Sequence, residues 1–261
     1  MSQEILKYDS VEISFEKCPV IQDISFSLHK GEILALVGES GSGKSSLIRS
    51  AVGLLNYDGE VSKGGIYYMG TNLLKLKEKE MRQVRGAEIG MIFQDAKSSL
   101  CPIRTIGEQI IESMSAHGKV DKNEAKNKAM DLFEKLKFKD GNKIWNSYPF
   151  ELSGGMNQRA SIAITMLLNP SILLADEPTS ALDVAVQKQV VDEMLKLREI
   201  FGTAIIIVTH DISVAAAMAD TVLVLKEGRM MEYGPAKKVF ESPESEYTKL
   251  LLSAVPRLKR K

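Results

Sequence analysis

The sequence predicts an α/β fold whose main sheet is mostly parallel. Four short apolar runs, at residues 33–37, 89–93, 171–176 and 204–210, are continuous rather than alternating. Continuous runs of this kind are typical of parallel strands that helices cover on both faces. Helix-forming segments separate the four runs, and alternating apolar residues precede the first. We therefore expect a helix-covered parallel sheet with antiparallel strands at its N-terminal side.

Two regions predict antiparallel strands. Apolar and polar residues alternate over 11–15 and again over 24–28, which is the period of half-buried strands. Residues 221–233 predict a hairpin that turns at 226–228.

Helices are expected at 46–55, 156–168 and 184–201. Apolar residues recur at near-helical spacing in the last of these, and Asp183 before it is a candidate N-cap. Residues 96–148 are charged and helical in pattern, and most of their charges are expected to form a solvated face. One apolar stripe marks the buried side of this region, formed by Ala125, Ala129, Leu132, Phe133 and Leu136.

The chain is expected to form one domain over residues 1–261. Its core would cover about 1–95 and 160–235, with a helical subdomain at about 96–159 and a short helical extension at about 236–261. The tail "VPRLKRK" has four basic residues, which suit either contact with anionic lipid or, preferably, a solvated chain end.

Composition narrows the class of protein. Lys plus Arg and Asp plus Glu both total 34, so no net charge draws the chain to nucleic acid. Cys18 and Cys101 are far apart and outside any CxxC spacing, which indicates free thiols in a reducing compartment. The sequence predicts no signal peptide and no apolar run of the ~18 residues that span a bilayer. Work at a membrane would therefore depend on partners.

The stretch "GESGSGKS" fits the phosphate-binding pattern G-x-x-x-x-G-K-[ST] and lies between a predicted strand and a predicted helix. Glycines allow the backbone N–H groups to wrap phosphates. Lys44 would bind the β- and γ-phosphates and Ser45 would bind Mg²⁺. The candidate nucleotide-binding residues are Gly38, Glu39, Ser40, Gly41, Ser42, Gly43, Lys44, Ser45 and Ser46.

Polar residues at strand ends supply the rest of an ATP-hydrolysing site. Asp176 ends a buried strand and suits Mg²⁺, while Glu177 is a candidate for orienting the attacking water. His210 follows another strand and is assigned to the γ-phosphate, although a structural role is the alternative. Gln94 follows a third strand and could bind Mg²⁺ or water and report nucleotide state to the helical region. His29 and His117 have no such context.

A second phosphate-binding device is predicted in "ELSGGMNQR". Ser153 is a natural N-cap, and its hydroxyl with the Gly154 and Gly155 amides would face an anion at a helix N-terminus. The chain would thus carry two phosphate-binding devices, one at residues 38–46 and one at 153–155.

The order and spacing of "GESGSGKS", "MIFQD", "LSGGMNQR", "ILLADEP", "SALD" and "VTHD" resemble those of ATP-binding cassette (ABC) ATPases over nearly the whole chain. The resemblance implies ATP and Mg²⁺ as ligands and a head-to-tail dimer in which "LSGGM" binds the partner's γ-phosphate. It implies that Asp183 crosses this interface and that Phe15 stacks on adenine, with Tyr8 the weaker candidate. Phe15 could instead fill the core.

A narrower resemblance is carried by "VRGAEIGMIFQD", "TIGEQI", "YPFELSGGMNQR", "DEPTSALDV" and "SPESEYTKLLLSAVP". These stretches are similar to the bacterial importer ATPases for di- and oligopeptides and for nickel, and to the first type in each unlike pair. Many peptide-importing relatives continue with a cysteine-bearing tail, whose absence favours the nickel or metal-chelate branch slightly. Cys101, where relatives commonly have Asn, and Lys97 are departures that bear on docking of the membrane subunits.

The resemblance implies an ATPase subunit at the cytoplasmic face of the membrane. Its partners would be an unlike second cassette, two permease subunits docking near Gln94 and the helical subdomain, and indirectly an extracytoplasmic solute-binding protein. No nucleic acid partner is expected. The alternatives are a soluble ABC ATPase of DNA repair or translation, whose coiled-coil insertions or fused cassettes this chain lacks, and an exporter cassette.

Overall fold

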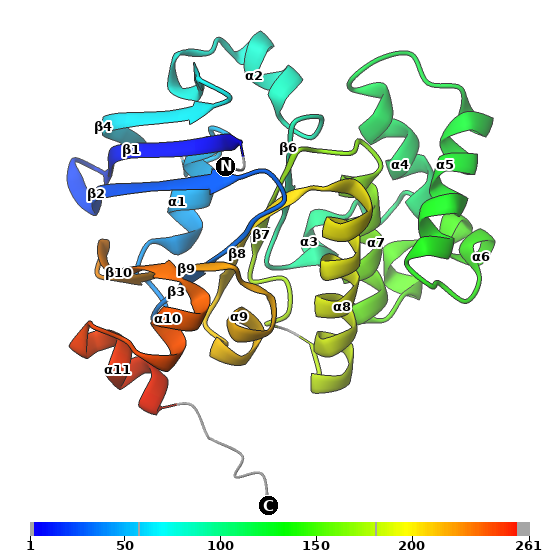
Figure 1. The fold of residues 1–261 in the computed structure, drawn as a ribbon. Helices are drawn as coiled ribbons and strands as arrows, with labels where there is room; N and C mark the ends of the chain where they lie inside the picture. Colours follow the sequence, from blue (N-terminus) through cyan, green and yellow to red (C-terminus); the bar gives the residue numbers. More distant parts are fainter. Residues whose placement is uncertain (1–2, 57, 181, 255–261) are drawn as a thin grey trace, which may run out of the picture. The chain divides into compact units, whose positions relative to one another are not determined.

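The computed structural model describes residues 3–56, 58–180 and 182–254 (Figure 1). The chain forms two compact units: a first unit, which runs to Lys77 and resumes at Ala204, and a second unit, Glu78–Thr203. The helical subdomain predicted at 96–159 falls inside the second unit, and its boundaries stay a prediction. The basic tail lies outside the described residues.

The first unit contains a four-stranded antiparallel sheet in the order β2-β1-β4-β5. Long strands β1 and β2 pair along most of their lengths, and β1 pairs with β4 on its other side. Ile24, Phe26 and Leu28 are buried and the serines between them are more exposed, so the alternation predicted over 24–28 is confirmed. Over 11–15 it holds only as far as Ile13, because Ser14 is buried and Phe15 is half-buried. The strands are β1 (Glu4–Phe15), β2 (Cys18–His29), β4 (Gly59–Tyr68) and β5 (Thr71–Asn72).

A second set of strands in the first unit has the order β10-β9-β3-β8. Strand β3 pairs in parallel with both β8 and β9, and β10 pairs with β9 as an antiparallel hairpin. Every residue of β3 and β8 is buried, as continuous apolar runs predict. The strands are β3 (Ile33–Val37), β8 (Ala204–Thr209), β9 (Thr221–Lys226) and β10 (Arg229–Pro235).

Short helices complete the first unit. They are α1 (Lys44–Ala51), the 3-10 turn η1 (Leu73–Lys75), α9 (Ile212–Met218), α10 (Ala236–Glu241) and α11 (Glu246–Ser253). Helix α1 begins two residues before the predicted 46 and ends four before 55. Gly43 starts it from a left-handed conformation, and Gly53, with φ 62°, follows its end.

The second unit consists of two paired parallel strands, β6 and β7, and most of the described helices. Helices α4, α5 and α6 pack together, and α7 packs on α3, β6 and α8. The elements are α2 (Glu78–Val84), β6 (Ile89–Ile92), α3 (Ala96–Ser99), α4 (Ile106–Ser115), α5 (Lys122–Lys135), α6 (Gly141–Asn146), η2 (Pro149–Glu151), α7 (Gly154–Met166), β7 (Ile172–Asp176) and α8 (Val184–Phe201).

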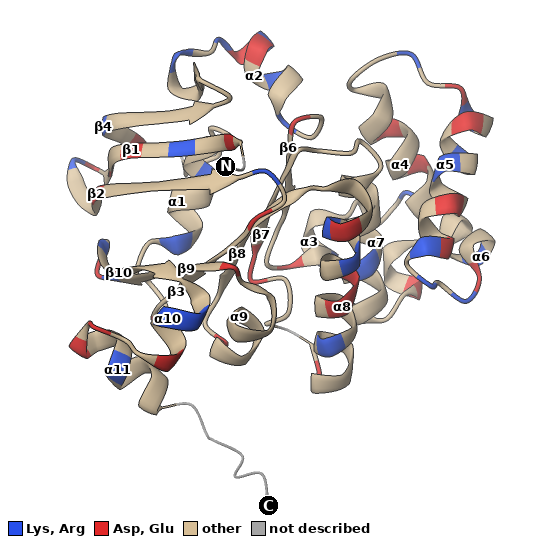
Figure 2. Ribbon diagram, viewed as in Figure 1, with Lys and Arg blue, Asp and Glu red and all other residues tan. Residues whose placement is uncertain are grey.

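The predicted apolar stripe of α5 is confirmed, because all five of its residues are buried. Charged residues recur along the same helix (Figure 2), and exposed Glu124 and Lys128 form an i,i+4 ion pair of 2.7 Å. Among the described residues, no helix is both long and apolar enough to cross a bilayer.

Candidate functional site

The loop after β3 has a backbone that only glycine tolerates at two positions. Gly38 has φ 149°, and a Cβ there would lie 2.0 Å from the Leu225 carbonyl oxygen. Gly43 has φ 95°, and its Cβ would lie 2.4 Å from Ile21 Cδ1. At Gly38 the loop therefore approaches backbone too closely for a side chain, and at both positions the positive φ strains any residue other than glycine.

Lys44, the first residue of α1, is folded back across this loop. Its Nζ donates to the carbonyl oxygens of Gly38 at 2.9 Å and Glu39 at 2.6 Å, and to Ser42 Oγ at 3.4 Å. The side chain is buried, and α1 begins without a side-chain cap. A loop wound around an ammonium and leading into a helix N-terminus is suited to a polyphosphate.

His210 leaves the sheet at the same edge as this loop. Val37 at the end of β3 is paired with Thr209 at the end of β8, so Gly38 and His210 are the next residues of two adjacent parallel strands. The His210 side chain is exposed. The following helix is fixed by Asp211, which accepts the Ser213 N–H at 2.7 Å.

The two aromatic candidates for adenine stacking differ in their surroundings. Tyr8 is fully buried, donates to the Leu47 carbonyl at 2.8 Å and stacks on Phe26 at 4.4 Å. Burial raises the pKa of its hydroxyl far above the usual value, so Tyr8 belongs to the core. Phe15 is half-buried at the end of β1. A Cβ on Gly59 would lie 2.6 Å from the Phe15 ring, so that glycine leaves room for the ring.

In the second unit, Gln94 and Glu177 come together. Parallel pairing of Ile92 with Ala175 brings the ends of β6 and β7 to one edge. Gln94 Nε2 then donates to Glu177 Oε2 at 3.2 Å. Glu177 has a left-handed φ of 46°, so the chain turns sharply directly after Asp176, which is fully buried. The sequence predicted this shared edge but not the contact between the two side chains.

The predicted second phosphate device is an exposed helix N-terminus. Ser153 caps α7, and its Oγ accepts the Met156 N–H at 3.3 Å. Ser153 and Gly154 are exposed, and no atom lies within 4 Å of a Cβ placed on Gly154. A Cβ on Gly155 would lie 2.4 Å from Val186 Cγ1, so α7 begins directly against the first turn of α8.

Asp183 is confirmed as the N-cap of α8. Its carboxylate accepts the N–H groups of Ala185 at 3.1 Å and Val186 at 3.0 Å. The side chain is exposed, so one of its oxygens caps the helix while the carboxylate stays open to solvent.

Sequence reasoning missed Asn157, which supports the Ser153 end of α7. Asn157 is 1% exposed, and its Nδ2 donates to the carbonyls of Pro149 at 2.9 Å and Leu152 at 3.3 Å. These bonds fix the turn that leads into Ser153. The sequence pattern that could have identified Asn157 is a polar residue on a helix face that also carries the buried Ala160 and Ala163.

A buried ion pair ties α7 to α8. Arg159 Nε donates to Glu193 Oε1 at 2.7 Å, its Nη2 donates to the Leu136 carbonyl at 2.5 Å, and its guanidinium lies 4.1 Å from the Phe138 ring centre. Burial raises the pKa of Glu193, and the charge of Arg159 opposes that rise. The ion pair between Arg159 and Glu193 therefore holds α7 against α8.

The oxygen donors predicted for Mg²⁺ are of a suitable chemical type. Ser45, Gln94 and Asp176 offer a hydroxyl, an amide oxygen and a carboxylate, and Mg²⁺ typically takes one or two protein oxygens beside water and phosphate. Within residues 3–254, apart from 57 and 181, no cluster of three His, Cys, Asp or Glu forms a metal-binding group. In chemical type, the hydroxyl, amide oxygen and carboxylate fit Mg²⁺ bound together with a nucleotide.

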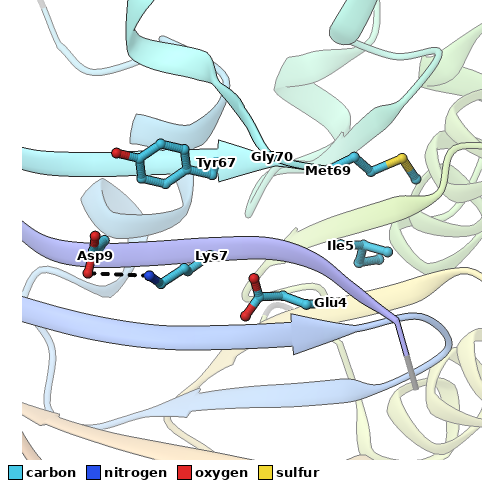
Figure 3. Close-up of a pocket in the computed structure, with 7 residues that line it drawn as sticks. All are labelled: Glu4, Ile5, Lys7, Asp9, Tyr67, Met69 and Gly70. Carbon is cyan, nitrogen blue, oxygen red and sulfur yellow. Dashed lines mark ion pairs between the residues drawn. The ribbon is translucent and has the colours of Figure 1, made fainter. Parts of the chain in front are cut away.

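The two cysteines and one surface hollow do not belong to the groups of candidate site residues described above. Cys18 is exposed and Cys101 half-buried, both as free thiols, as predicted. A shallow hollow of 220 Å³ on β1 and β4 includes none of the predicted site residues (Figure 3). Lys7 and Asp9 form an ion pair of 3.6 Å along its edge.

A protein-family model described as ABC transporter matches residues 21–180. The chain belongs to the ABC transporter family. It binds ATP and is an ATPase, and the alternatives in DNA repair and translation are not supported by the relatives described next.

Relatives in sequence include ATP-binding proteins of peptide transporters. The oligopeptide transport protein AmiE of Streptococcus pneumoniae is 44% identical over 91% of this chain and 67% of its own length. OppD of Escherichia coli, also named for oligopeptide transport, is 44% identical over 91% and 70%. The dipeptide transport protein DppD of Bacillus subtilis is 39% identical over 98% and 78%.

Solved ABC cassettes share the fold. The cbiO1 protein of Clostridium perfringens, part of the cbiONQ transporter complex, superposes with a TM-score of 0.80 at 26% identity over 92% of each chain. MJ0796, dimeric with ADP and Pi, gives 0.78 at 27% identity over 89% of this chain and 99% of its own. The predicted α/β fold with an ABC-type core is confirmed.

Proposed function

We propose that this chain is the ATPase subunit of a bacterial peptide importer. It would act at the cytoplasmic face of the membrane with a second, unlike cassette, two permease subunits and an extracytoplasmic solute-binding protein. The observation that carries the proposal is the identity of 39–44% to oligopeptide and dipeptide transport ATP-binding proteins over most of the chain. Nickel, which the sequence favoured slightly, remains the alternative solute.

The first unit would hold ATP. The loop from Gly38 to Ser46 wraps the phosphates with backbone N–H groups, and Lys44 supplies positive charge that can move from loop carbonyls to phosphate oxygens. Phe15 would stack on the adenine. His210 would donate a hydrogen bond to the γ-phosphate from the adjacent strand end.

The second unit would supply the groups that act on water and on the metal ion. Glu177 would accept a proton from the attacking water, and Gln94, which donates to it, would fix its orientation. Mg²⁺ would be held by Ser45, Gln94 and Asp176. When bound, this ion neutralises charge on the phosphate oxygens.

Ser153, Gly154 and Gly155 would bind the γ-phosphate held by a partner cassette. This role is supported by the exposed N-terminus of a 13-residue helix with an open glycine beside it. Asp183, exposed at the neighbouring helix start, would face the same partner. Each ATP would then join two subunits, and hydrolysis would release them.

A groove of 260 Å³ in the second unit is suited to the permease subunits. It is lined by residues of the segment after β6 and of α4 and α7, among them Phe93, Leu100, Glu112 and Ile164. Gln109 lies in its wall and bonds the Cys101 backbone through both its Oε1, at 2.8 Å, and its Nε2, at 3.1 Å. These two hydrogen bonds hold the loop that carries Ile103. The Ile103 side chain is 82% exposed, so an exposed apolar side chain lies beside the groove.

Substitution Ser153→Arg should stop hydrolysis at the partner's nucleotide and leave this chain's own nucleotide affinity unchanged. Removing one phosphate donor and filling its space is expected to cost about a hundredfold in kcat. The measurement is the ATPase rate of the paired cassettes beside a nucleotide titration of the isolated variant. Ser115→Arg, at the exposed end of α4, is the control and should change neither. A lowered affinity in the isolated Ser153 variant would contradict this assignment.

Transport assays test the proposed solute. The chain, assembled in proteoliposomes with its permease subunits, a second cassette and the binding protein, should hydrolyse ATP several-fold faster when the binding protein carries a peptide. Binding protein without solute is the control. Stimulation by a nickel chelate and not by peptides would assign the nickel branch, and stimulation by DNA or ribosomes would refute an import role.

A further inference from the structure

Two aromatic side chains lie on the surface of the turn that leads into Ser153. The centres of the Tyr148 and Phe150 rings are 5.3 Å apart, and the ring planes are inclined by 10°, so the rings form a nearly parallel stack. Phe150 is 65% exposed and Tyr148 36%. Ordered aromatic faces that are open to solvent are suited to a ligand with a flat π-surface.

Hydrogen bonds hold the turn that carries the two rings. The Tyr148 N–H donates to Glu151 Oε2 at 2.8 Å, and the Tyr148 carbonyl accepts the Glu151 N–H at 3.0 Å. The carbonyl of Pro149, between the two rings, accepts both the Leu152 N–H at 3.2 Å and Asn157 Nδ2 at 2.9 Å. The turn is therefore ordered without a ligand, and little conformational entropy would be lost when one binds.

The exposed apolar patch is small and has polar neighbours. Asn146 before the rings and Glu151 after them are both exposed, while Pro149 between the rings is buried. The centre of a protein–protein interface is typically formed by a larger cluster of apolar side chains that exclude water together. Two stacked rings correspond better to the face of a single nucleobase.

The rings lie within the length of a nucleotide from the proposed phosphate-binding end of α7. Phe150 and Ser153 are three residues apart, so their Cα atoms are separated by at most roughly 10 Å. A nucleoside triphosphate spans a comparable length from its γ-phosphate to its base. Ser153 and Gly154 are exposed, so a nucleotide with its γ-phosphate at this helix end can reach the rings with its base.

We propose that Tyr148 and Phe150 bind the purine base of the ATP whose γ-phosphate is held at Ser153, Gly154 and Gly155. This inference rests on the proposed role of those three residues toward the nucleotide of a partner cassette. The base stacks on the exposed face of the Phe150 ring, and Tyr148 packs on the other face of that ring. The chain then contacts the partner's nucleotide at both ends, which strengthens ATP-dependent pairing and favours purine over pyrimidine nucleotides.

Fluorescence of 2-aminopurine riboside triphosphate, in its non-hydrolysable β,γ-imido form, tests the stack directly. An aromatic ring stacked on 2-aminopurine quenches its emission, so the probe should lose fluorescence when the two cassettes pair. Phe150→Leu should reduce the quenching that appears on pairing and weaken nucleotide-dependent pairing by about tenfold, as expected for one stacked base. Phe150→Trp keeps a ring and should retain both. The isolated chain should bind the probe equally well in all variants.

The nucleotide preference of the paired cassettes gives a second readout. The ratio of kcat/KM for ATP to kcat/KM for UTP should fall by about tenfold in Phe150→Leu, because a pyrimidine offers less area for stacking. Ile200→Ala is the matched control, since Ile200 is an apolar residue of the same unit and is 42% exposed. It should keep the quenching and the preference of the wild type.

Unchanged quenching and nucleotide preference in both Phe150→Leu and Tyr148→Leu would overturn the proposal. So would a loss that appears only with the permease subunits present, which would assign the rings to a membrane partner. Ser153→Arg separates this inference from its basis. If that variant keeps full hydrolysis at the partner's nucleotide, the phosphate role of residues 153–155 fails and the base contact with it. If it stops hydrolysis while both aromatic variants behave as the wild type, the base contact alone fails.

Discussion

Replacing Glu177 by Gln is expected to reduce kcat for ATP hydrolysis by at least about a hundredfold while ATP still binds. The amide has the shape of the carboxylate but does not accept the water's proton, and general-base contributions are typically 10²–10⁴-fold. In the structure Glu177 Oε2 already accepts from Gln94 Nε2 at 3.2 Å. The variant keeps an oxygen for that bond, so the strand ends should stay in place.

Single-turnover and steady-state ATPase assays measure this loss, and an equilibrium titration with ATP measures binding. Bound ATP that is not hydrolysed should also hold the cassettes together, so light scattering should detect a dimer with ATP and not with ADP. Glu134→Gln, an exposed carboxylate of α5, is the control and should keep the full rate. Hydrolysis at the wild-type rate by the Glu177 variant would show that another group activates the water.

The continuous apolar runs predicted the parallel strands because burial on both faces leaves a direct trace in sequence. Val37 and Thr209 end adjacent strands, as expected from runs followed by the loop and by His210. The end of α1 was misplaced, since the spacing of its apolar residues continues to 55 although Gly53 turns the chain earlier. A backbone conformation of one glycine outweighed the pattern there.

Contacts between side chains distant in sequence were beyond prediction. Nothing in "MIFQD" or "LLADEP" indicates that Gln94 would meet Glu177, because the contact depends on a left-handed turn at Glu177. The sequence ranked Phe15 above Tyr8 for adenine stacking only through the resemblance to ABC ATPases, because both are aromatic residues of one strand. The structure adds a physical reason, since the register with β2 stacks Tyr8 on Phe26 in the core.

Replacing Arg159, a buried residue of α7, should destabilise the protein by about 3–5 kcal/mol, because Glu193 then keeps a buried charge without its partner. Arg159 is 8% and Glu193 7% exposed, and the guanidinium also bonds the Leu136 carbonyl at 2.5 Å. Arg159→Met retains most of the side-chain volume, so the loss is chiefly electrostatic. Urea unfolding at pH 7.5 measures it.

The pH dependence of that loss identifies Glu193 as its cause. A carboxyl whose folded pKa is raised binds more protons in the folded state than in the unfolded one, so stability falls as pH rises from its ordinary value of 4.5 through the folded pKa. In Arg159→Met the pKa of Glu193 should rise further, because the opposing charge is gone. The loss of unfolding free energy in Arg159→Met should therefore be smaller at pH 5.5 than at pH 8.

Two further variants complete the measurement. Arg159→Met with Glu193→Leu removes both charges and should recover much of the lost stability, since an apolar pair carries no desolvation cost. Arg82→Met breaks the pair with Glu78, whose side chains are 75% and 60% exposed, and should cost less than about 1 kcal/mol. A deficit in Arg159→Met that persists unchanged in the double variant and at pH 5.5 would assign the loss to the Leu136 carbonyl and the Phe138 ring instead of to the buried charge.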